Sequence, residues 1–351
     1  LKEARATAPQ KMVAPSSIPS SLLIMQNSKT ISGIVRAYVD QRIKSGPDSA
    51  ASLPVEEWDD DRYTYRGSIR EGTQSEVDIY VDTLTNRSLA VKQMWQDDFV
   101  NNDEIDSPKV ETKLNQIDLL SQVQDAGVCS LNEVYRNAAG ELLLVSEWMP
   151  ERDLFSFSLS LGHPGPEREE KVLQMLPALL DAVERLHKCG IAHCNLCVEN
   201  AMIHESLDPE DHRPIVMLSD FTCSKQDVVA SSAQGPSGKA MYVPPEAHMD
   251  ETYDARSADL FACGVIAYSC AIGSYPWVST VPKKDKAFTY YWDSGLDMYL
   301  NKRMCCQESK RVTVGECMSP YFKELLSLLW SRDPQERSKA LALAKAHQEM
   351  P

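Results

Sequence analysis

The spacing of apolar residues near the start of the chain predicts a helix. In "NSKTISGIVRAYVDQRIKSG", the apolar residues from Ile31 to Ile43 recur at three- and four-residue intervals, with polar capping candidates before them and Gly46-Pro47 after them. This period predicts an amphipathic helix with a single apolar stripe. The stripe either packs on the chain's own domain or covers another molecule. Its polar face is not basic enough to favour a membrane surface.

The pattern then changes twice. Alternating, β-rich stretches begin near Trp58: "YTYRGSI", "SEVDIYVDTL", "RSLAVKQMW" and "ELLLVSEWM", with a helical segment, "VETKLNQIDLLSQVQ", before the last of them. After Pro150 long helical stretches dominate, notably "REEKVLQMLPALLDAVERLHKCG". A strand-rich lobe followed by a helix-rich lobe predicts an α+β, bilobed fold. We expect an N-terminal helical extension at 1–57, a small lobe at 58–149 and a large lobe at 150–351.

Composition and charge restrict the function classes. The chain has 351 residues, which is too long for one small core. Its hydrophobic share of 43% is ordinary for a soluble globular protein. Its formal net charge of -15 repels polyanions, so nucleic acid is not expected as a partner. No uncharged apolar run is long enough to predict a transmembrane segment, and "LKEARATAPQ" contains no apolar signal region.

Cysteine is frequent, with ten residues in the chain. Cys194 and Cys197 form a C-x-x-C pair, for which a redox or metal-binding role is weighed against a structural one. Cys305 and Cys306 are adjacent, and the even count permits disulfides in a secreted protein without assigning any.

Several short motifs occur in a fixed order, and together they resemble those of protein kinases. They are "LAVK", "IAHCNLCVENAMI", "LSDFTCS", "YVPPEA", "DLFACGVIAY" and "RDPQERSKA". The resemblance implies a lysine for the ATP phosphates at Lys92 and a metal-binding aspartate at Asp220. It also implies that Glu246, at the end of the activation segment, pairs with Arg337, and that Asp259 anchors the large lobe. His193 and Phe221 are expected to be packing residues.

The connector between the lobes is also placed by this resemblance. "LLLVSEWMPERDLF" puts Ser146 at the gatekeeper position, 147–149 in the hinge and Asp153 near a ribose. A small gatekeeper residue leaves space behind a bound adenine. The side chain of Trp148 or Met149 could fill that space. A working adenine site and a purely structural linker therefore remain equal alternatives.

The catalytic loop departs from the kinase pattern in its charged residues. Where a kinase has its catalytic aspartate, this chain has Asn195, whose amide cannot accept a proton at neutral pH. Cys194 replaces the preceding arginine, and Cys197 replaces a lysine that would stabilise the transferring phosphate. Because phosphoryl transfer depends on positioning and charge stabilisation, these losses compound one another.

The nucleotide apparatus is reduced but not absent. In the glycine-rich loop, the three glycine positions hold Arg70, Gly72 and Ser75, so side chains obstruct the approach of phosphates to the backbone. Lys92, Asn200 and Asp220 persist, and the last two could hold magnesium. The position that pairs with Lys92 in a kinase is occupied either by Glu111 or, by leucine spacing, by Gln116. If it is Gln116, Lys92 lacks a charged partner.

The degenerate glycine loop, the N-terminal helix and the acidic, cysteine-containing chain resemble the secreted rhoptry-type kinases and pseudokinases of Toxoplasma and its relatives. The likeness is to the divergent branch that lacks the glycine-rich loop, and Asn195 matches only its inactive members. This resemblance implies secretion into a parasitophorous vacuole or cyst wall. It also implies protein partners, such as other secreted parasite kinases or wall proteins.

We therefore expect a catalytically inactive pseudokinase, not an enzyme, that acts as a protein-binding scaffold or allosteric partner. No cofactor is expected, although weak binding of ATP and magnesium stays open. The alternative is an atypical, slow ATP-dependent protein kinase that uses Lys92, Asn200 and Asp220. A third hypothesis is a structural wall component whose cysteines cross-link.

Overall fold

The computed structural model describes most of the chain from residue 55 onward. The described residues are 55–71, 75–93, 100–101, 104–105, 128–129, 131–138, 142–148, 153–204, 213–221, 223–226, 233–249 and 252–348. The expected helix at 31–43, Gly72 and both candidate partners of Lys92, Glu111 and Gln116, lie outside these ranges.

A sheet of six strands forms the first part of the described chain. Its strands are β1 (Val55–Glu57), β2 (Tyr63–Glu71), β3 (Ser75–Asp82), β4 (Ser88–Gln93), β7 (Leu131–Arg136) and β8 (Leu142–Glu147). They lie in the order β1-β7-β8-β4-β3-β2, antiparallel except for the parallel pair β1–β7. The short strands β5 (Val100–Asn101) and β6 (Glu104–Ile105) pair separately.

Apolar residues at every second position of a strand explain why one face of this sheet is packed. On β4, Leu89 and Val91 are buried, and they join a cluster with Tyr63, Tyr135 and other residues. Strands β3 and β4 are connected by a tight turn, and Asn86 takes a positive φ of 56° there, a conformation that asparagine tolerates.

Helices dominate the second part. They are α4 (Leu154–Ser160), α5 (Pro166–Lys188), α6 (Glu246–Met249), α7 (Ala255–Ile272), α8 (Lys286–Ser294), α9 (Leu296–Lys302), α10 (Pro320–Leu329) and α11 (Lys339–Gln348), with 3-10 turns η3 (Val314–Cys317) and η4 (Pro334–Ser338). Short strand pairs accompany them: β9 (Ile191–Ala192) with β12 (Lys225–Gln226), β10 (Ala201–His204) with β11 (Ile215–Leu218), and β13 (Met304–Gln307) with β14 (Lys310–Thr313).

Helices α5 and α7 form the centre of this helical part. Helix α5 begins with Pro166, has Glu167 and Glu169 in its first turn and basic residues in its last, which complements the helix dipole. Helix α7 is capped by Asp254 and ends at Gly273, which has a left-handed φ of 71°. Both pack into one large core that also contains α10.

Helix α7 is the only described helix that is long and apolar enough to cross a membrane. Of its 18 residues, 83% are buried inside the helical part, as expected for the core helix of a globular domain. Its apolar character is therefore explained by the core.

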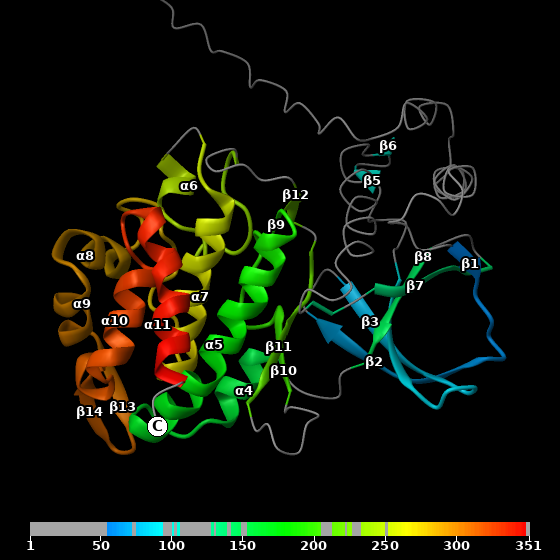
Figure 1. The fold of residues 1–351 in the computed structure, drawn as a ribbon, viewed down its shortest axis with the longest axis horizontal. Helices are drawn as coiled ribbons and strands as arrows, with labels where there is room; N and C mark the ends of the chain where they lie inside the picture. The colour runs from blue at the N-terminus through cyan, green and yellow to red at the C-terminus, as the bar shows by residue number, and fades with distance from the viewer. Residues whose placement is uncertain are drawn as a thin grey trace, which may run out of the picture.

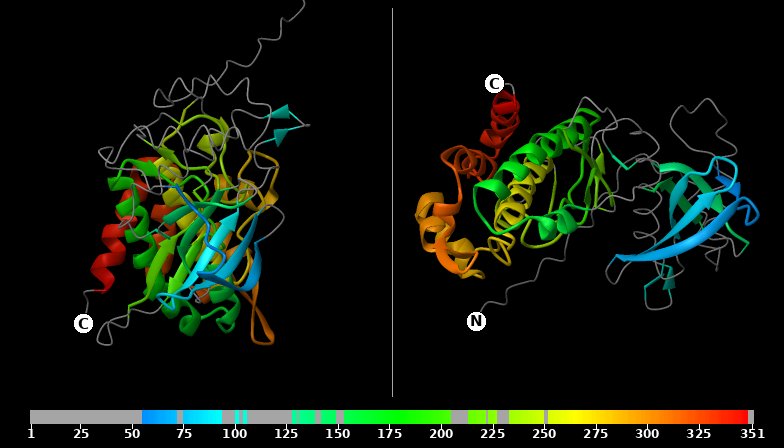
Figure 2. Two further views of the ribbon diagram at one scale, coloured as in Figure 1. Left: turned by 90° about the vertical axis from the view of Figure 1, so that its right-hand side faces the viewer. Right: turned by 90° about the horizontal axis from the view of Figure 1, so that it is seen from below.

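The two parts are separate lobes, with sheet on one side and helices on the other (Figures 1 and 2). Figure 1 shows β9 to β12 along the side of α5 that faces the sheet. The α+β, bilobed fold expected from the sequence is confirmed. The segments between β9 and β12 carry the candidate site.

Candidate functional site

Strand pairing brings the catalytic-loop motif to the "LSDF" motif. Residues 193–200 connect β9 to β10, and β10 pairs antiparallel with β11, with Ala201 opposite Leu218. The Ser219 amide donates to the Asn200 carbonyl oxygen at 2.9 Å. This register places Asn200, directly before β10, beside Asp220, two residues after the end of β11.

A chain of amide hydrogen bonds joins the polar residues of this site. Asn195 Nδ2 donates to Asp220 Oδ2 at 2.8 Å. Asn200 Nδ2 donates to the Asn195 carbonyl oxygen at 2.8 Å and lies 3.5 Å from Asp220 Oδ2. The position that holds a carboxylate base in a kinase therefore holds a hydrogen-bond donor to Asp220.

Asp259 of α7 anchors the start of the loop. Its Oδ2 accepts from the His193 amide and its Oδ1 from the Cys194 amide, both at 2.8 Å. His187 Nε2 lies 2.9 Å from Oδ2 as a third partner. The Asp259 carboxylate is buried, and these contacts compensate for the cost of burying its charge.

His193 is a packed, neutral residue. Its Nδ1 accepts from the Asn195 amide at 3.3 Å, so Nε2 carries the proton and donates to the Ser219 carbonyl oxygen at 2.9 Å. Complete burial lowers its pKa, which favours the neutral ring. The ring also contacts Phe221, with centroids 4.8 Å apart. Both residues therefore lie where packing residues were expected.

The backbone of the site adopts an uncommon conformation at two positions. Cys194 and Asp220 both have a φ of 60°, in the left-handed region that side chains with a Cβ rarely occupy. The Asp259 contacts to the loop hold the first of them. Such conformations persist where the surrounding structure overdetermines them, which is common at functional sites.

The C-x-x-C pair does not resemble a reactive thiol pair. Cys194 and Cys197 are both buried, and desolvation raises the pKa of each, that of Cys197 to about 12. A reactive or metal-binding cysteine has a lowered pKa. Within the described ranges no two cysteines form a disulfide, and no group of three or more His, Cys, Asp or Glu residues could hold a metal ion.

Lys92 lies on β4 of the other lobe. Its Cα is paired with Val77 of β3 and Leu144 of β8. Among the described residues, no carboxylate forms an ion pair with the Lys92 side chain. Arg70 and Ser75 belong to the β2–β3 hairpin, where the backbone of Arg70 lies opposite Glu76 and that of Ser75 opposite Glu71.

The connector between the lobes is only partly described. Ser146 Oγ donates to the Ala90 carbonyl oxygen at 3.4 Å, and the Trp148 amide donates to the Ser88 carbonyl oxygen. Met149 lies outside the described residues. Asp153 caps α4, because its Oδ1 accepts from the Ser156 amide at 2.7 Å. This contact gives Asp153 a structural function that the sequence did not indicate.

Glu246 and Arg337 form a buried ion pair. The two guanidinium nitrogens of Arg337 contact the two carboxylate oxygens at 2.5 and 3.1 Å, and Arg337 also donates to carbonyl oxygens of Ser257 and Ser331. The pair ties α6 to η4, as the sequence motifs implied.

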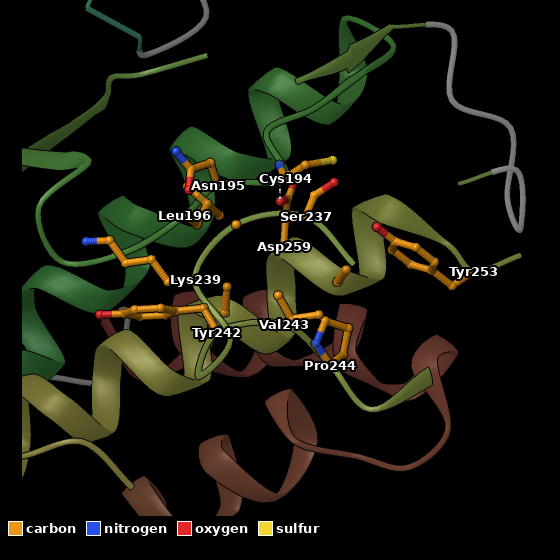
Figure 3. A pocket seen from close by; sticks show the side chains of 13 residues that line it. Cys194, Asn195, Leu196, Ser237, Lys239, Tyr242, Val243, Pro244, Tyr253 and Asp259 are labelled. Carbon is orange, nitrogen blue, oxygen red and sulfur yellow. Dashed lines mark hydrogen bonds between the residues drawn. The ribbon is translucent and has the colours of Figure 1, made fainter. Parts of the chain in front are cut away.

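Sequence reasoning missed a second ion pair close to the loop. Lys239 Nζ contacts Glu199 Oε1 at 2.9 Å, which connects the segment before α6 to the residue next to Asn200. Lys239 and Asn195 also line one pocket, on the same side of it (Figure 3). The available signal was the "SGK" sequence shortly before Glu246, whose glycine allows a close approach to the loop.

Asn200 and Asp220 fit a magnesium ion by their chemistry. They offer an amide oxygen and a carboxylate, the hard ligands that Mg²⁺ prefers. The Nδ2 hydrogen bond of Asn200 to the loop leaves its Oδ1 as the acceptor of that side chain. One or two protein ligands suffice, because magnesium keeps waters and takes nucleotide phosphates as further ligands.

The architecture and the site define the class of protein. A small lobe with Lys92 on a central strand, and a large lobe with Asn200 and Asp220 in contact, are the arrangement of kinase-type phosphoryl transfer. A family model described as "Protein kinase domain" matches residues 63–348. This match covers more than half of the chain, which therefore belongs to the protein kinase domain family.

Curated proteins of rice, Oryza sativa subsp. japonica, are similar to this chain. CBL-interacting protein kinase 9 is 23% identical over 278 residues, which cover 75% of this chain and 57% of that protein. CBL-interacting protein kinase 24 is 27% identical over 220 residues, which cover 62% of this chain and 44% of that protein. The chain thus spans about half the length of the curated relatives that it matches.

These comparisons correct several expectations. The resemblance to rhoptry-type pseudokinases of Toxoplasma is wrong, because the chain matches a protein kinase domain model and is similar to plant protein kinases. Secretion into a vacuole or cyst wall rested on that resemblance alone, so this localisation is wrong as well. The expectation of a non-enzyme is also wrong, because both relatives are named protein kinases and point to an enzyme.

Proposed function

We propose that this chain is an ATP-dependent protein kinase that works slowly, without a carboxylate base in its catalytic loop. The observation that supports the proposal is the contact of Asn195, Asn200 and Asp220, which preserves the oxygen ligands for magnesium beside the loop. Similarity to named protein kinases supports the same reaction class. The substrates are then MgATP and a protein hydroxyl group.

Each residue has a defined task in this proposal. Lys92 binds the ATP phosphates from the small lobe, and Asn200 and Asp220 hold the magnesium ion, which neutralises charge on the phosphates. The Asn195 amide orients Asp220 by its 2.8 Å hydrogen bond. Since Asn195 cannot accept a proton, the acceptor hydroxyl loses its proton to the phosphate oxygens or to water.

Missing general-base catalysis sets the expected rate. A positioned base contributes about 10² to 10⁴ in rate, so we expect turnover lower by that factor than in the Asn195→Asp variant. The new carboxylate would lie beside Asp220, and like charges disfavour their joint ionisation. Magnesium should therefore stabilise Asn195→Asp against heat more than it stabilises the wild type.

The test is MgATP-dependent phosphate transfer to a mixed serine and threonine peptide library, followed as radioactive product. Lys92→Ala and Asp220→Ala should abolish transfer, whereas Lys310→Ala, a change of an exposed lysine on β14, should leave it unchanged. In a parallel thermal-melt titration, ATP and magnesium should raise the melting temperature of the wild type but not that of Lys92→Ala or Asp220→Ala. Equal transfer by the wild type and both site variants would contradict the proposal.

A further inference from the structure

The segment before α6 lies directly on the catalytic loop. Gly238 has a φ of 84°, and a Cβ added there would lie 2.9 Å from the Cys194 carbonyl oxygen and 3.3 Å from Asn195 Oδ1. A side chain at this position would therefore push the segment and the loop apart. The contact fixes the following residue, Lys239, beside the loop, and Figure 3 shows both segments around one pocket.

Lys239 is the cation of this pocket. The residues that line it, all described, include no other lysine or arginine. Its ammonium contacts Glu199 Oε1 at 2.9 Å, with side chains 47% and 37% exposed, so it is held in place and still reached by solvent. An ammonium has three donors, so the contact with Glu199 leaves donors for another anion.

The charges around Lys239 favour its protonated form. Burial lowers its pKa, but the Cys197 sulfur and the Glu199 carboxylate more than offset this, and the net pKa is raised. Lys239 is therefore an ammonium at neutral pH, and the 2.9 Å contact with Glu199 holds it beside the loop.

Transfer of a phosphoryl group needs positive charge on the acceptor side, since the transferring group and the Asp220 carboxylate are both anionic. Cys197, in the loop, supplies none. We propose that Lys239 supplies this charge, so that the cation for the transferring phosphate comes from the segment before α6 and not from the loop. This inference rests on the proposed kinase function. Lys239 would then be a catalytic residue, and Glu199 would position its ammonium.

The main experiment compares transfer rates of Lys239→Met and Glu199→Gln. Lys239→Met removes the cation, and we expect kcat to fall about 10²-fold, as for the loss of one charge-stabilising donor. Glu199→Gln breaks the ion pair but keeps the cation, so kcat should fall less than tenfold. If the pair only fastened the segment to the loop, both variants would lose the same activity, which would overturn the inference.

Two further variants sharpen the result. Lys188→Met breaks a matched exposed pair, Lys188 with Glu184 at 2.8 Å, and should leave kcat unchanged. The double variant Cys197→Lys with Lys239→Thr moves the cation into the loop and should recover most of the rate lost in Lys239→Met. Melting curves with MgATP check folding and nucleotide binding, which Lys239→Met should leave intact. No recovery in a folded double variant would count against the role of Lys239.

The same series in an Asn195→Asp background separates this inference from the proposed function. If the wild type transfers no phosphate and Asn195→Asp does, the base-free kinase is wrong, and the loss caused by Lys239→Met is measured in the variant. If transfer occurs but is indifferent to Lys239→Met, only the role of Lys239 is overturned. If neither background transfers phosphate, both proposals fail.

Discussion

The two lobes hold their charged residues in opposite ways. In the large lobe, Asp259 and Arg337 are fully buried and each contacts several backbone groups of the catalytic loop or of neighbouring turns. In the small lobe, the main described ion pair joins Asp82 to Arg62, whose side chain is 28% exposed. Lys92 has no ion pair with a described carboxylate.

This difference shows where the fold itself specifies the site. The loop that carries Asn195 and Asn200 is fixed by the core of the large lobe, because removing a loop contact would leave a charge buried without a partner. Among the described residues, the strand that carries Lys92 is held by sheet pairing and by apolar packing, not by a buried charge. Disrupting the buried charges of the large lobe, Asp259 and Arg337, should therefore cost more stability than disrupting the pair of the small lobe. Three substitutions test that order, and a fourth concerns a helix cap.

The largest loss is expected for Arg337→Ala. It leaves Glu246 as an uncompensated, largely buried carboxylate, so the free energy of unfolding should fall by about 3–5 kcal/mol. Urea denaturation measures it. Lys339→Ala breaks an exposed pair with Glu336 and should change stability by less than about 1 kcal/mol. Equal effects of the two variants would contradict the comparison.

Asp259→Asn should cost about 1.5–3 kcal/mol, because an amide replaces a charged acceptor and keeps only one oxygen for the three donors around it. Hydrogen exchange should locate the effect at the amides of His193 and Cys194. Asp254→Asn is the matched control at the start of the same helix, since asparagine caps helices as well as aspartate does. Unchanged exchange at both loop amides would show that Asp259 does not hold the loop.

A smaller, pH-dependent loss is expected in the small lobe. The Arg62 guanidinium holds the pKa of Asp82 well below its ordinary range. A carboxylate with a lowered pKa contributes stability above its unfolded-state pKa of about 4, and this contribution is lost as the pH falls further. Between pH 5 and 3 the wild type should lose about 1 kcal/mol more than Asp82→Asn. Parallel curves from urea melts at each pH would rule this out.

The smallest effect is expected at Asp153. Asp153→Ala removes the cap of α4 and should cost about 1 kcal/mol, whereas Asp153→Asn keeps a capping oxygen and should cost only a few tenths. If Asp153 is only a cap, neither variant changes the ATP concentration at half-maximal thermal shift. A weaker ATP response in both variants would return Asp153 to the ribose site predicted from the sequence.

The sequence predicted the parts of the site that depend on short, ordered motifs. Glu246 and Arg337 are far apart in the chain, yet each lies in a motif with fixed local structure, and the structure brings them together. Asn200 lies directly before β10 and Asp220 shortly after β11, and the pairing of those two strands sets their contact. In these cases the local pattern determines the geometry once the fold is known.

Other contacts could not be predicted because they depend on proximity without a local pattern. The ion pair of Lys239 and Glu199 joins an exposed lysine to a half-buried glutamate, and both residue types are common on any surface. The cap by Asp153 depends on where α4 begins, which spacing alone leaves uncertain. The prediction of a rhoptry-type pseudokinase was wrong for a different reason. It depended on missing glycines and on an acidic composition, and distant branches of one family can acquire both features independently.

Helix α7 has a consequence for how the protein reaches its folded state. It is apolar on nearly every side, and Gly264 touches the Trp330 side chain so closely that a Cβ would lie 2.6 Å from Nε1. While the chain is still incomplete, α10 is not yet available to cover this surface, since it follows α7 in sequence. Among the described helices, α7 therefore exposes a long apolar surface during synthesis, and this surface stays open to aggregation until Trp330 has left the ribosome.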